Sequence, residues 1–240
     1  MKYTKEEMLS KVDHTLLKPE ATWPQIRTLC DEAIANHCAS VCINTCYVKQ
    51  AVEYMAGRVP VCCVVGFPLG AMDTKSKAFE AKTAIENGAS EVDMVINIGW
   101  LKNKQYDDVR NDIAAVKAAV GDKVLKVIIE TCLLTDDEKI KMCEIVSDSG
   151  ADFIKTSTGK GYPGATPEAV YTMCQVLKKY HSITGKRVGI KVAGGVRTAE
   201  EAVRYYTIVK EVLGNDWLNK DLFRIGASSL VEDIEHRLGK

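Results

Sequence analysis

The stretch VLKVIIETCLLTDDEKIKMCEIVSDSGADFIKT, residues 124–156, decides the fold. It opens on an apolar run rich in Val and Ile, Val124–Thr131, and closes on a second apolar run, Asp152–Thr156. Between them, Thr135-x-x-Glu138 fits a capping box, in which the two side chains satisfy free backbone N–H groups at the start of a helix. The stretch therefore predicts a strand, a helix and a second strand, which is the βαβ unit of parallel sheets.

The same alternation of apolar runs and helical spacing extends over the chain. Helix starts are indicated by capping boxes at Thr22-x-x-Gln25 and Thr198-x-x-Glu201, and by Thr166 before Pro167. Behind such starts the apolar residues keep the spacing of one buried helix face, as in Ile26, Leu29, Cys30 and Ala33, in Val109, Ile113, Val116 and Val120, and in Val170, Met173, Cys174 and Leu177. Eight strands are predicted: Lys11–Leu16, Ser40–Asn44, Val61–Phe67, Glu91–Asn97, Val124–Thr131, Asp152–Thr156, Gly189–Ala193 and Phe223–Gly226.

These strand candidates are almost continuously hydrophobic, which is typical of parallel strands covered on both faces. Eight strand-then-helix units without a linker or a shift in composition predict an α/β fold, a single-domain (β/α)8 TIM barrel with a closed parallel sheet over residues 1–240. A doubly wound open sheet is the alternative. It is disfavoured because the first strand-to-helix turns carry no Gly-x-Gly-x-x-Gly motif.

Composition excludes several classes of function. The chain has 32 Lys and Arg against 32 Asp and Glu, so no global positive field favours nucleic acid. Nine cysteines without a Cys-x-x-Cys pair, and four scattered histidines, argue against a zinc site and for a reducing, cytoplasmic location. The longest apolar run, Val59–Met72, is interrupted by Pro and Gly and is too short for a bilayer, and no signal peptide precedes it, so we expect no membrane association.

Charged residues inside the predicted strands are the first candidates for chemistry. Asp93 lies in EVDMVIN, Lys126 in VLKVIIET, Lys155 in DFIKTST and Lys191 in GIKVAGG, and a barrel of this kind carries its active site at the carboxyl ends of its strands. If the three lysines converge, repulsion and burial lower their pKa values, as a Schiff-base lysine requires. The alternative for each lysine is a simple ion pair with a carboxylate. The residues themselves do not rank the three lysines, and Asp93 fits a proton carrier or a salt-bridge partner equally well.

Other conspicuous residues are best explained by packing. His14, beside Asp13, is expected to be a satisfied core or rim histidine rather than a base. Cys42 and the Cys62-Cys63 pair are expected to pack as small hydrophobic residues. The charged stretch from Lys102 to Asp112 is expected to be a solvated helix face.

Three glycine-rich segments follow the sixth, seventh and eighth predicted strands, where barrels often bind phosphate. Glycine lets backbone N–H groups approach an anion, and hydroxyl and cationic side chains add to the attraction. A phosphorylated substrate is therefore expected, held by residues from all three segments: Gly159, Lys160, Gly194, Gly195, Val196, Arg197, Gly226, Ser228 and Ser229.

With these motifs the sequence resembles the 2-deoxyribose-5-phosphate aldolase family of class I, metal-independent aldolases. The matching stretches run through most of the chain: DHTLLKP (13–19), GFPLG (66–70), EVDMVINIG (91–99), LKVIIET (125–131), ADFIKTSTGKG (151–161), IKVAGGVRT (190–198) and RIGASS (224–229). The segments FIKTSTG and AGGVRT together are highly specific for this family, whereas GFPLG alone is not.

The resemblance implies reversible cleavage of 2-deoxy-D-ribose 5-phosphate to glyceraldehyde 3-phosphate and acetaldehyde, without a metal or another cofactor. By position, Lys155 matches the Schiff-base lysine, Lys191 the second lysine of the site, and Asp93 the proton-shuttling carboxylate. Lys126, Asp13 and Thr15 match supporting positions. Some members carry a C-terminal tail that ends in tyrosine, whereas this sequence ends HRLGK, so we expect proton transfer here without such a residue.

Two alternatives remain at this stage. One is a Schiff-base aldolase of the same architecture that acts on another sugar phosphate, and the other is a catalytically silent barrel that binds a sugar phosphate as a sensor. The expected partner is a small phosphorylated sugar, and we expect a homo-oligomer, a dimer or a tetramer. The sequence does not show which, because helix faces that dock a second subunit resemble those that dock the barrel.

Overall fold

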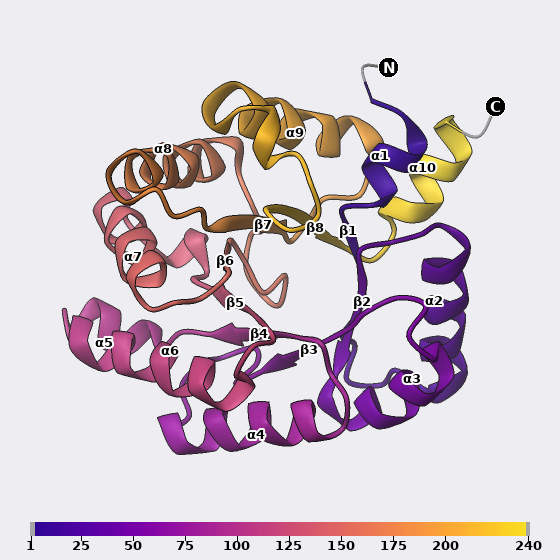
Figure 1. Ribbon diagram of the computed structural model, residues 1–240, viewed down its shortest axis with the longest axis horizontal. Coiled ribbons are helices and arrows are strands. Elements are labelled where there is room, and N and C mark those ends of the chain that lie inside the picture. Colours follow the sequence, from indigo (N-terminus) through magenta and orange to yellow (C-terminus); the bar gives the residue numbers. More distant parts are fainter. Residues whose placement is uncertain (1–2, 239–240) are drawn as a thin grey trace.

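A computed structural model describes residues 3–238 of the chain and confirms the closed barrel (Figure 1). Eight parallel strands pair in sequence order, and β1 closes the sheet by pairing with β8. All eight predicted strands form, and the doubly wound alternative is excluded. The strands are β1 (Val12–Leu16), β2 (Ser40–Asn44), β3 (Val61–Val65), β4 (Glu91–Val95), β5 (Val124–Ile128), β6 (Phe153–Lys155), β7 (Gly189–Ala193) and β8 (Phe223–Ala227).

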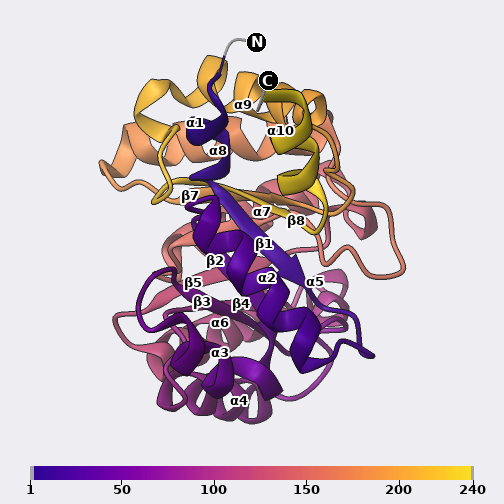
Figure 2. The same ribbon diagram turned by 90° about the vertical axis from the view of Figure 1, so that its right-hand side faces the viewer.

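Helices surround the barrel as an outer ring, and α1 and α10 lie side by side (Figures 1 and 2). None of the helices in residues 3–238 has the combination of length and apolar character needed to cross a bilayer. The α-helices are α1 (Lys5–Leu9), α2 (Trp23–Ala35), α3 (Val48–Met55), α4 (Thr74–Glu86), α5 (Ile98–Lys102), α6 (Tyr106–Val120), α7 (Asp136–Asp148), α8 (Pro167–Thr184), α9 (Ala199–Leu213) and α10 (Leu230–Leu238). Three short 3-10 turns cover Thr45–Tyr47, Thr131–Leu133 and Asn215–Trp217.

The predicted helix starts are confirmed. Capping boxes form before α2, α7 and α9, and the side chain of Thr166 accepts from the backbone of Ala169 at the start of α8. The apolar stripes predicted for α2, α6 and α8 are buried. They belong to the large hydrophobic core between the barrel and the helices. A much smaller apolar cluster, consisting of Leu17, Cys42, Cys62 and Val64, is packed separately from it.

The expectation of a solvated face from Lys102 to Asp112 is wrong at its last residue. Asp112 is fully buried in α6, and its Oδ2 accepts from Lys77 Nζ of α4 at 2.6 Å. The same ammonium donates to the carbonyl of Val95 at 2.9 Å. Gly66 leaves room for this arrangement, since a Cβ there would lie 3.1 Å from Lys77 Cγ. A buried partner on another helix decides the environment of Asp112, and the local sequence does not reveal it.

Candidate active site

The three strand lysines converge on one carboxylate inside the barrel. Asp93 Oδ2 accepts from Lys155 Nζ at 2.8 Å and from Lys191 Nζ at 2.7 Å, and Asp93 Oδ1 accepts from Lys126 Nζ at 3.0 Å. Strand register brings these residues together, since Asp93 is paired with Lys126 across β4 and β5, and Lys155 with Lys191 across β6 and β7. The convergence expected from the sequence is therefore confirmed.

Two more carboxylates and an arginine extend this group into a network. Asp13 accepts from Lys191 at 2.6 Å and from Arg224 at 2.5 Å. Glu91 accepts from Lys126 at 2.5 Å and from Arg224 at 2.8 Å. The network thus holds three carboxylates and four cationic groups, all of them buried. It carries one surplus positive charge, which disappears when one of its lysines is a neutral amine.

The carboxylates shift the pKa values of two lysines in the direction opposite to the one expected from mutual repulsion. Burial by itself would lower the pKa of Lys191, but Asp13 and Asp93 outweigh it and raise the pKa above its ordinary value. Burial likewise opposes the charge of Lys126, and the carboxylates led by Asp93 raise the pKa of Lys126 well above its ordinary value. These two lysines are therefore held as ammonium ions.

The carboxylates of the network are held as anions. Burial opposes the charge of Asp93, but Lys126, Lys155 and Lys191 together bring its pKa well below the ordinary value. For Asp13 burial is again the opposing effect, and Lys191 and Arg224 contribute most to lowering its pKa. Close ion pairs within the network thus keep its carboxylates ionised.

Lys155 differs from the other two lysines in its contacts. It has one carboxylate partner, Asp93, whereas Lys191 has two and Lys126 has three within 4 Å. Lys155 also lines a cavity of about 230 Å³, and neither Lys126 nor Lys191 does. The structure therefore separates the three lysines that the residues alone left equal, because only Lys155 can meet a molecule in this cavity.

Most of the residues expected to bind substrate line this cavity. It lies where the loops after β1, β6, β7 and β8 meet, at the carboxyl ends of the strands. Asp93, Lys126, Lys191 and Asp13 do not line its wall, and neither does Ser229. The expected residues that do are Thr15, Lys155, Gly159, Lys160, Gly194, Gly195, Val196, Arg197, Gly226 and Ser228.

Several residues of the cavity wall are not among those expected from the sequence. Leu16 ends β1, and Leu17 and Lys18 begin the loop that follows it. Lys18 adds a third basic residue beside Lys160 and Arg197. The signal was present in the motif DHTLLKP, which spans the end of the first predicted strand and could have placed these residues at the mouth of the barrel. The other missed residues are Thr158, Ala193 and Ala227.

Glycine is required where the loop after β6 crosses the end of β7. Gly194 has a φ of +85°, and a Cβ there would lie 2.8 Å from Gly164 Cα. A Cβ on Gly164 would lie only 1.8 Å from the carbonyl oxygen of Gly194. The two backbones can therefore approach each other only without side chains, and this approach shapes one wall of the cavity.

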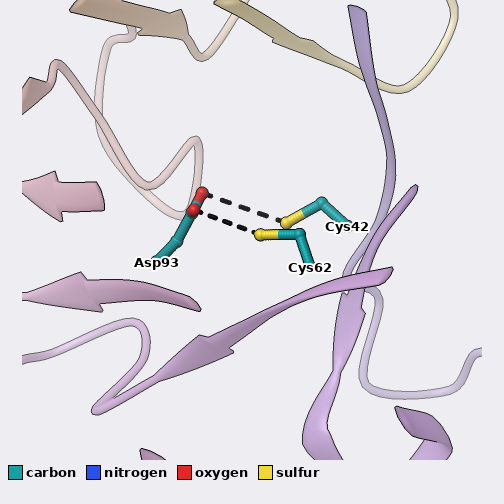
Figure 3. A group of neighbouring side chains, drawn as sticks. All are labelled: Cys42, Cys62 and Asp93. Atoms are coloured by element: carbon teal, nitrogen blue, oxygen red, sulfur yellow. Dashed lines mark hydrogen bonds between the residues drawn. The ribbon is translucent and has the colours of Figure 1, made fainter. Parts of the chain in front are cut away.

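Cys42 and Cys62 also face Asp93 (Figure 3). Cys42 Sγ lies 4.0 Å from Asp93 Oδ2, and Cys62 Sγ lies 3.2 Å from Asp93 Oδ1. Burial raises the pKa of the Cys62 thiol well above its ordinary value. The expectation that both cysteines are packed inside is confirmed, but their neighbour is a carboxylate, whereas Cys63 belongs to the large hydrophobic core.

Cys42, Cys62 and Asp93 form the one group of three metal-ligand residues found within residues 3–238. Both oxygens of Asp93 already accept hydrogen bonds from lysine ammonium groups. A divalent cation would have to displace at least one of these ammonium groups and would be repelled by the others. This donor set therefore does not favour a metal ion.

His14 is buried, as the packing interpretation predicts. Its Nε2 lies 2.6 Å from Glu32 Oε2 on α2, so the ring points to the helix layer and not to the lysines. His14 is therefore no candidate for the base of the site.

Comparisons with known proteins agree with this geometry. The chain matches a family described as DeoC/LacD family aldolase over residues 7–229. It is 54% identical over 217 residues to a deoxyribose-phosphate aldolase of Clostridioides difficile, covering 90% of this chain and 96% of that one. A deoxyribose-phosphate aldolase of Finegoldia magna is 50% identical over 232 residues, covering 95% of this chain and 99% of the relative.

Solved structures show the same fold at lower identity. A protein described as a deoxyribose-phosphate aldolase from Coccidioides immitis superimposes with a TM-score of 0.86 at 40% identity, covering 98% of this chain and 87% of that one. The deoxyribose phosphate aldolase of Aeropyrum pernix, described as tetrameric, gives a TM-score of 0.79 at 29% identity, covering 97% and 91%. Both the family match and these identities extend over nearly the whole barrel, and the chain therefore belongs to the DeoC/LacD family of aldolases.

Proposed function

We propose that the protein is a class I aldolase that reversibly cleaves 2-deoxy-D-ribose 5-phosphate to D-glyceraldehyde 3-phosphate and acetaldehyde. The observation that carries the proposal is the position of Lys155. It is the one lysine of the network that lines the cavity, and it lies beside a carboxylate and a second lysine. An amine in this setting can bond covalently to an aldehyde.

In the proposed reaction, the neutral amine of Lys155 attacks the C1 aldehyde of the open-chain sugar. Loss of water then gives a protonated imine. A base removes the proton of the C3 hydroxyl, and the C2–C3 bond breaks. C3 becomes the aldehyde carbon of the released glyceraldehyde 3-phosphate, and the electrons of the bond move into the imine to form an enamine. Protonation and hydrolysis of the enamine release acetaldehyde and regenerate the amine. The imine withdraws electrons, so the reaction needs neither a metal nor another cofactor.

Lys191 and Asp93 are assigned to proton transfer in this scheme. Asp93 Oδ2 contacts both Lys155 Nζ and Lys191 Nζ. When Lys155 loses a proton, the Asp93 carboxylate therefore still has the Lys191 ammonium as its partner. The base at C3 is proposed to be Asp93 acting with Lys191 through water. Asp13 and Lys126 support this pair by contacting Lys191 and Asp93 respectively, and Thr15 donates to the Asp13 carbonyl at 2.7 Å.

The phosphate is proposed to bind at the glycine-rich wall of the cavity. Lys160 and Arg197 supply positive charge, and Gly159, Gly194, Gly195, Val196 and Gly226 supply a wall that is mostly backbone. Ser228, directly after β8, adds a hydroxyl. Ser229 is included as a candidate ligand, although it does not line the cavity.

Trapping with borohydride tests the central assignment. Borohydride reduces an imine to a stable secondary amine, so treatment with deoxyribose 5-phosphate or acetaldehyde should leave one added group on the peptide that contains Lys155. Peptide mass mapping locates the adduct, and the Lys155→Met variant should form none. An adduct on Lys191, or no adduct on the wild type, would falsify the assignment.

A product assay separates this function from the alternatives. Coupled reduction by an alcohol dehydrogenase detects acetaldehyde, which an aldolase for another sugar phosphate does not release. A sensor that only binds the sugar phosphate releases no product at all.

We also propose a cytoplasmic homo-oligomer, a dimer or a tetramer. All nine cysteines are free, including Cys42 and Cys62 on neighbouring strands, which fits a reducing compartment. The relative from Aeropyrum pernix is described as tetrameric, which supports self-association. Light scattering on the eluting protein gives the mass of the assembly, and a monomer would contradict this part of the proposal.

A further inference from the structure

We propose that Glu130 is a positioning residue that holds the loop after β6 in the shape needed to bind the phosphate of the substrate. The inference deepens the proposed function and rests on it. Glu130 follows β5, is 2% exposed and does not line the cavity. It therefore acts on the site only through the residues that it contacts.

The Glu130 carboxylate binds the loop at Thr158. Its two oxygens accept from the Thr158 backbone N–H at 3.2 and 3.3 Å, and one of them accepts from the Thr158 hydroxyl. That hydroxyl in turn accepts from the Lys160 backbone N–H at 3.1 Å. Thr158, Gly159 and Lys160 all line the cavity. One buried carboxylate thus determines the backbone path of the wall that is proposed to receive phosphate.

Two backbone hydrogen bonds beside Glu130 reinforce this attachment. The N–H of Ile129 donates to the carbonyl of Lys155 at 3.0 Å, and the N–H of Thr131 donates to the carbonyl of Thr156 at 2.9 Å. Residues 129–131 therefore hold residues 155–158 at three successive points. The first point fixes Lys155 and the last fixes the phosphate loop, so the two parts of the site are held from the same segment.

Glu130 is unfavourable for folding on two grounds. Its φ of +53° lies in the left-handed region that side chains other than glycine avoid. Within residues 3–238, no lysine, arginine or histidine lies within ion-pair distance of its buried carboxylate. Burying a carboxylate without a cation is costly, and such local costs concentrate at functional sites.

The way Glu130 binds the loop leaves the ammonium group of Lys160 available. Because the Glu130 carboxylate is not neutralised, its bonds to Thr158 are charge-assisted and strong. They engage backbone and hydroxyl groups and leave the ammonium of Lys160 unused, and no carboxylate in the described residues forms an ion pair with that ammonium. The loop is held firmly while its positive charge remains available for a phosphate group.

Steady-state kinetics of Glu130→Ala, Glu130→Gly and Glu130→Gln test this role on deoxyribose 5-phosphate and on free deoxyribose. In the Ala and Gly variants, we expect KM for the phosphorylated substrate to rise about tenfold or more, and kcat/KM for free deoxyribose to change less than about threefold. The Gln variant keeps an acceptor oxygen and should stay within about threefold of wild type on both substrates.

Each other outcome overturns the proposal. Equal losses on both substrates would show a general structural role. A Gly variant with wild-type KM would show that the left-handed backbone, and not the carboxylate, is what matters. A Gln variant as impaired as the Ala variant would show that the charge of Glu130, and not its hydrogen bonds to Thr158, sets KM.

A second variant keeps the test valid if the Glu130 variants fail to fold. Thr158→Val removes the hydroxyl from the loop with little change in volume, and it should give the same selective rise in KM. Cys132→Ser is the matched control, because Cys132 Sγ touches the same carboxylate at 4.0 Å from an exposed position outside the cavity. We expect wild-type kinetics for this control, and an equal loss in both variants would refute the role.

Borohydride trapping with acetaldehyde separates this inference from the proposed function. Acetaldehyde has no phosphate, so the folded variants should form the Lys155 adduct as the wild type does. Failure of the wild type to form the adduct refutes the proposed function and this inference with it. If the wild type forms the adduct and the variants lose no phosphate selectivity, only the role of Glu130 is refuted.

Discussion

Asp93 is the residue on which the charge balance of the barrel depends. It is fully buried, and its two oxygens meet the ammonium groups of Lys126, Lys155 and Lys191. Removing one member of a buried ionic group leaves the charges of the others uncompensated. This lowers stability more than replacing the whole group with well-packed apolar residues. A role in stability and a role in proton transfer are therefore inseparable at this position.

Asp93→Asn should lower the free energy of unfolding at neutral pH by about 3–5 kcal/mol, because it leaves buried ammonium groups uncompensated. The pKa of Asp93 is lower in the folded state than in the unfolded state, where it is about 3.9. Its contribution is therefore complete above about pH 4 and is lost as the pH falls below that value toward the folded-state pKa. Urea unfolding from about pH 7 down to about pH 3 should show a steeper loss for the wild type than for the variant. Parallel curves would contradict this account.

Lys155 shows how position selects among chemically identical residues. Lys126 and Lys191 each contact at least two carboxylates and do not line the cavity, whereas Lys155 contacts one carboxylate and lines the cavity. The three amines have the same intrinsic reactivity. Their different surroundings explain why one is assigned to covalent chemistry and two to the support of charge.

At the scale of elements, the loops after the strands carry the binding residues and the strands carry the charges. The loop after β8 is short and leads directly into α10, so its serines lie close to the start of a helix. Ser228 lines the cavity and Ser229 does not. This difference makes the two neighbouring serines a matched pair for experiment.

Ser228→Leu should weaken the binding of deoxyribose 5-phosphate far more than that of free deoxyribose, because the larger side chain occupies the space proposed for the phosphate. Ser229→Leu should have the smaller effect on KM. Competition by inorganic phosphate in both variants gives an independent measure of the site. Equal losses for the two sugars in the Ser228 variant would argue against a phosphate site there.

The contact between α4 and α6 is an element-scale feature without a role in the chemistry. Lys77 and Asp112 are both fully buried and paired at 2.6 Å, and Thr74 also donates to Asp112 at 2.9 Å. Burial lowers the pKa of Lys77, and Asp112 opposes the shift. The pair joins two helices to the end of β4.

Lys77→Met should destabilise the fold by about 3–5 kcal/mol, since it leaves the Asp112 carboxylate buried without a cation. The double variant Lys77→Met/Asp112→Leu should recover most of this loss, because a well-packed apolar pair can replace a buried ion pair. Urea unfolding of the wild type, the two single variants and the double variant measures the coupling. A double variant no more stable than Lys77→Met would show that geometry, and not charge, limits stability here.

At the scale of the whole molecule, charge is distributed unevenly although its sum is zero. The chain has no net charge at neutral pH, so it has no overall attraction for an anionic substrate. Lys18, Lys160 and Arg197 nevertheless line one cavity at one end of the barrel. Attraction of a phosphorylated sugar must therefore come from this local group.

Raising the ionic strength should increase KM for deoxyribose 5-phosphate and leave KM for free deoxyribose nearly unchanged. Salt screens exposed charges, and the screening length falls from about 10 Å at 0.1 M to about 3 Å at 1 M. Kinetics over this range of sodium chloride concentration measure the effect. A parallel rise for both sugars would mean that salt acts on the fold or on the chemical step.

The barrel could be predicted from the sequence because its determinants are local. Periodic apolar residues and capping boxes such as Thr135 with Glu138 depend on neighbours a few positions away, and the eight strands followed from them. The strand lysines were also visible as candidates, since a buried ammonium needs a specific reason. The resemblance to a known family then assigned them roles.

The tertiary structure alone decided what those candidates touch. Lys155 and Asp93 are 62 residues apart in the chain, and only strand register brings their side chains together. The burial of Asp112, the cavity position of Lys155 and the hold of Glu130 on Thr158 likewise depend on partners from distant segments. Patterns along the chain determine which elements form, whereas closure of the barrel determines which side chains meet, because contacts between distant segments leave no local signal in the sequence.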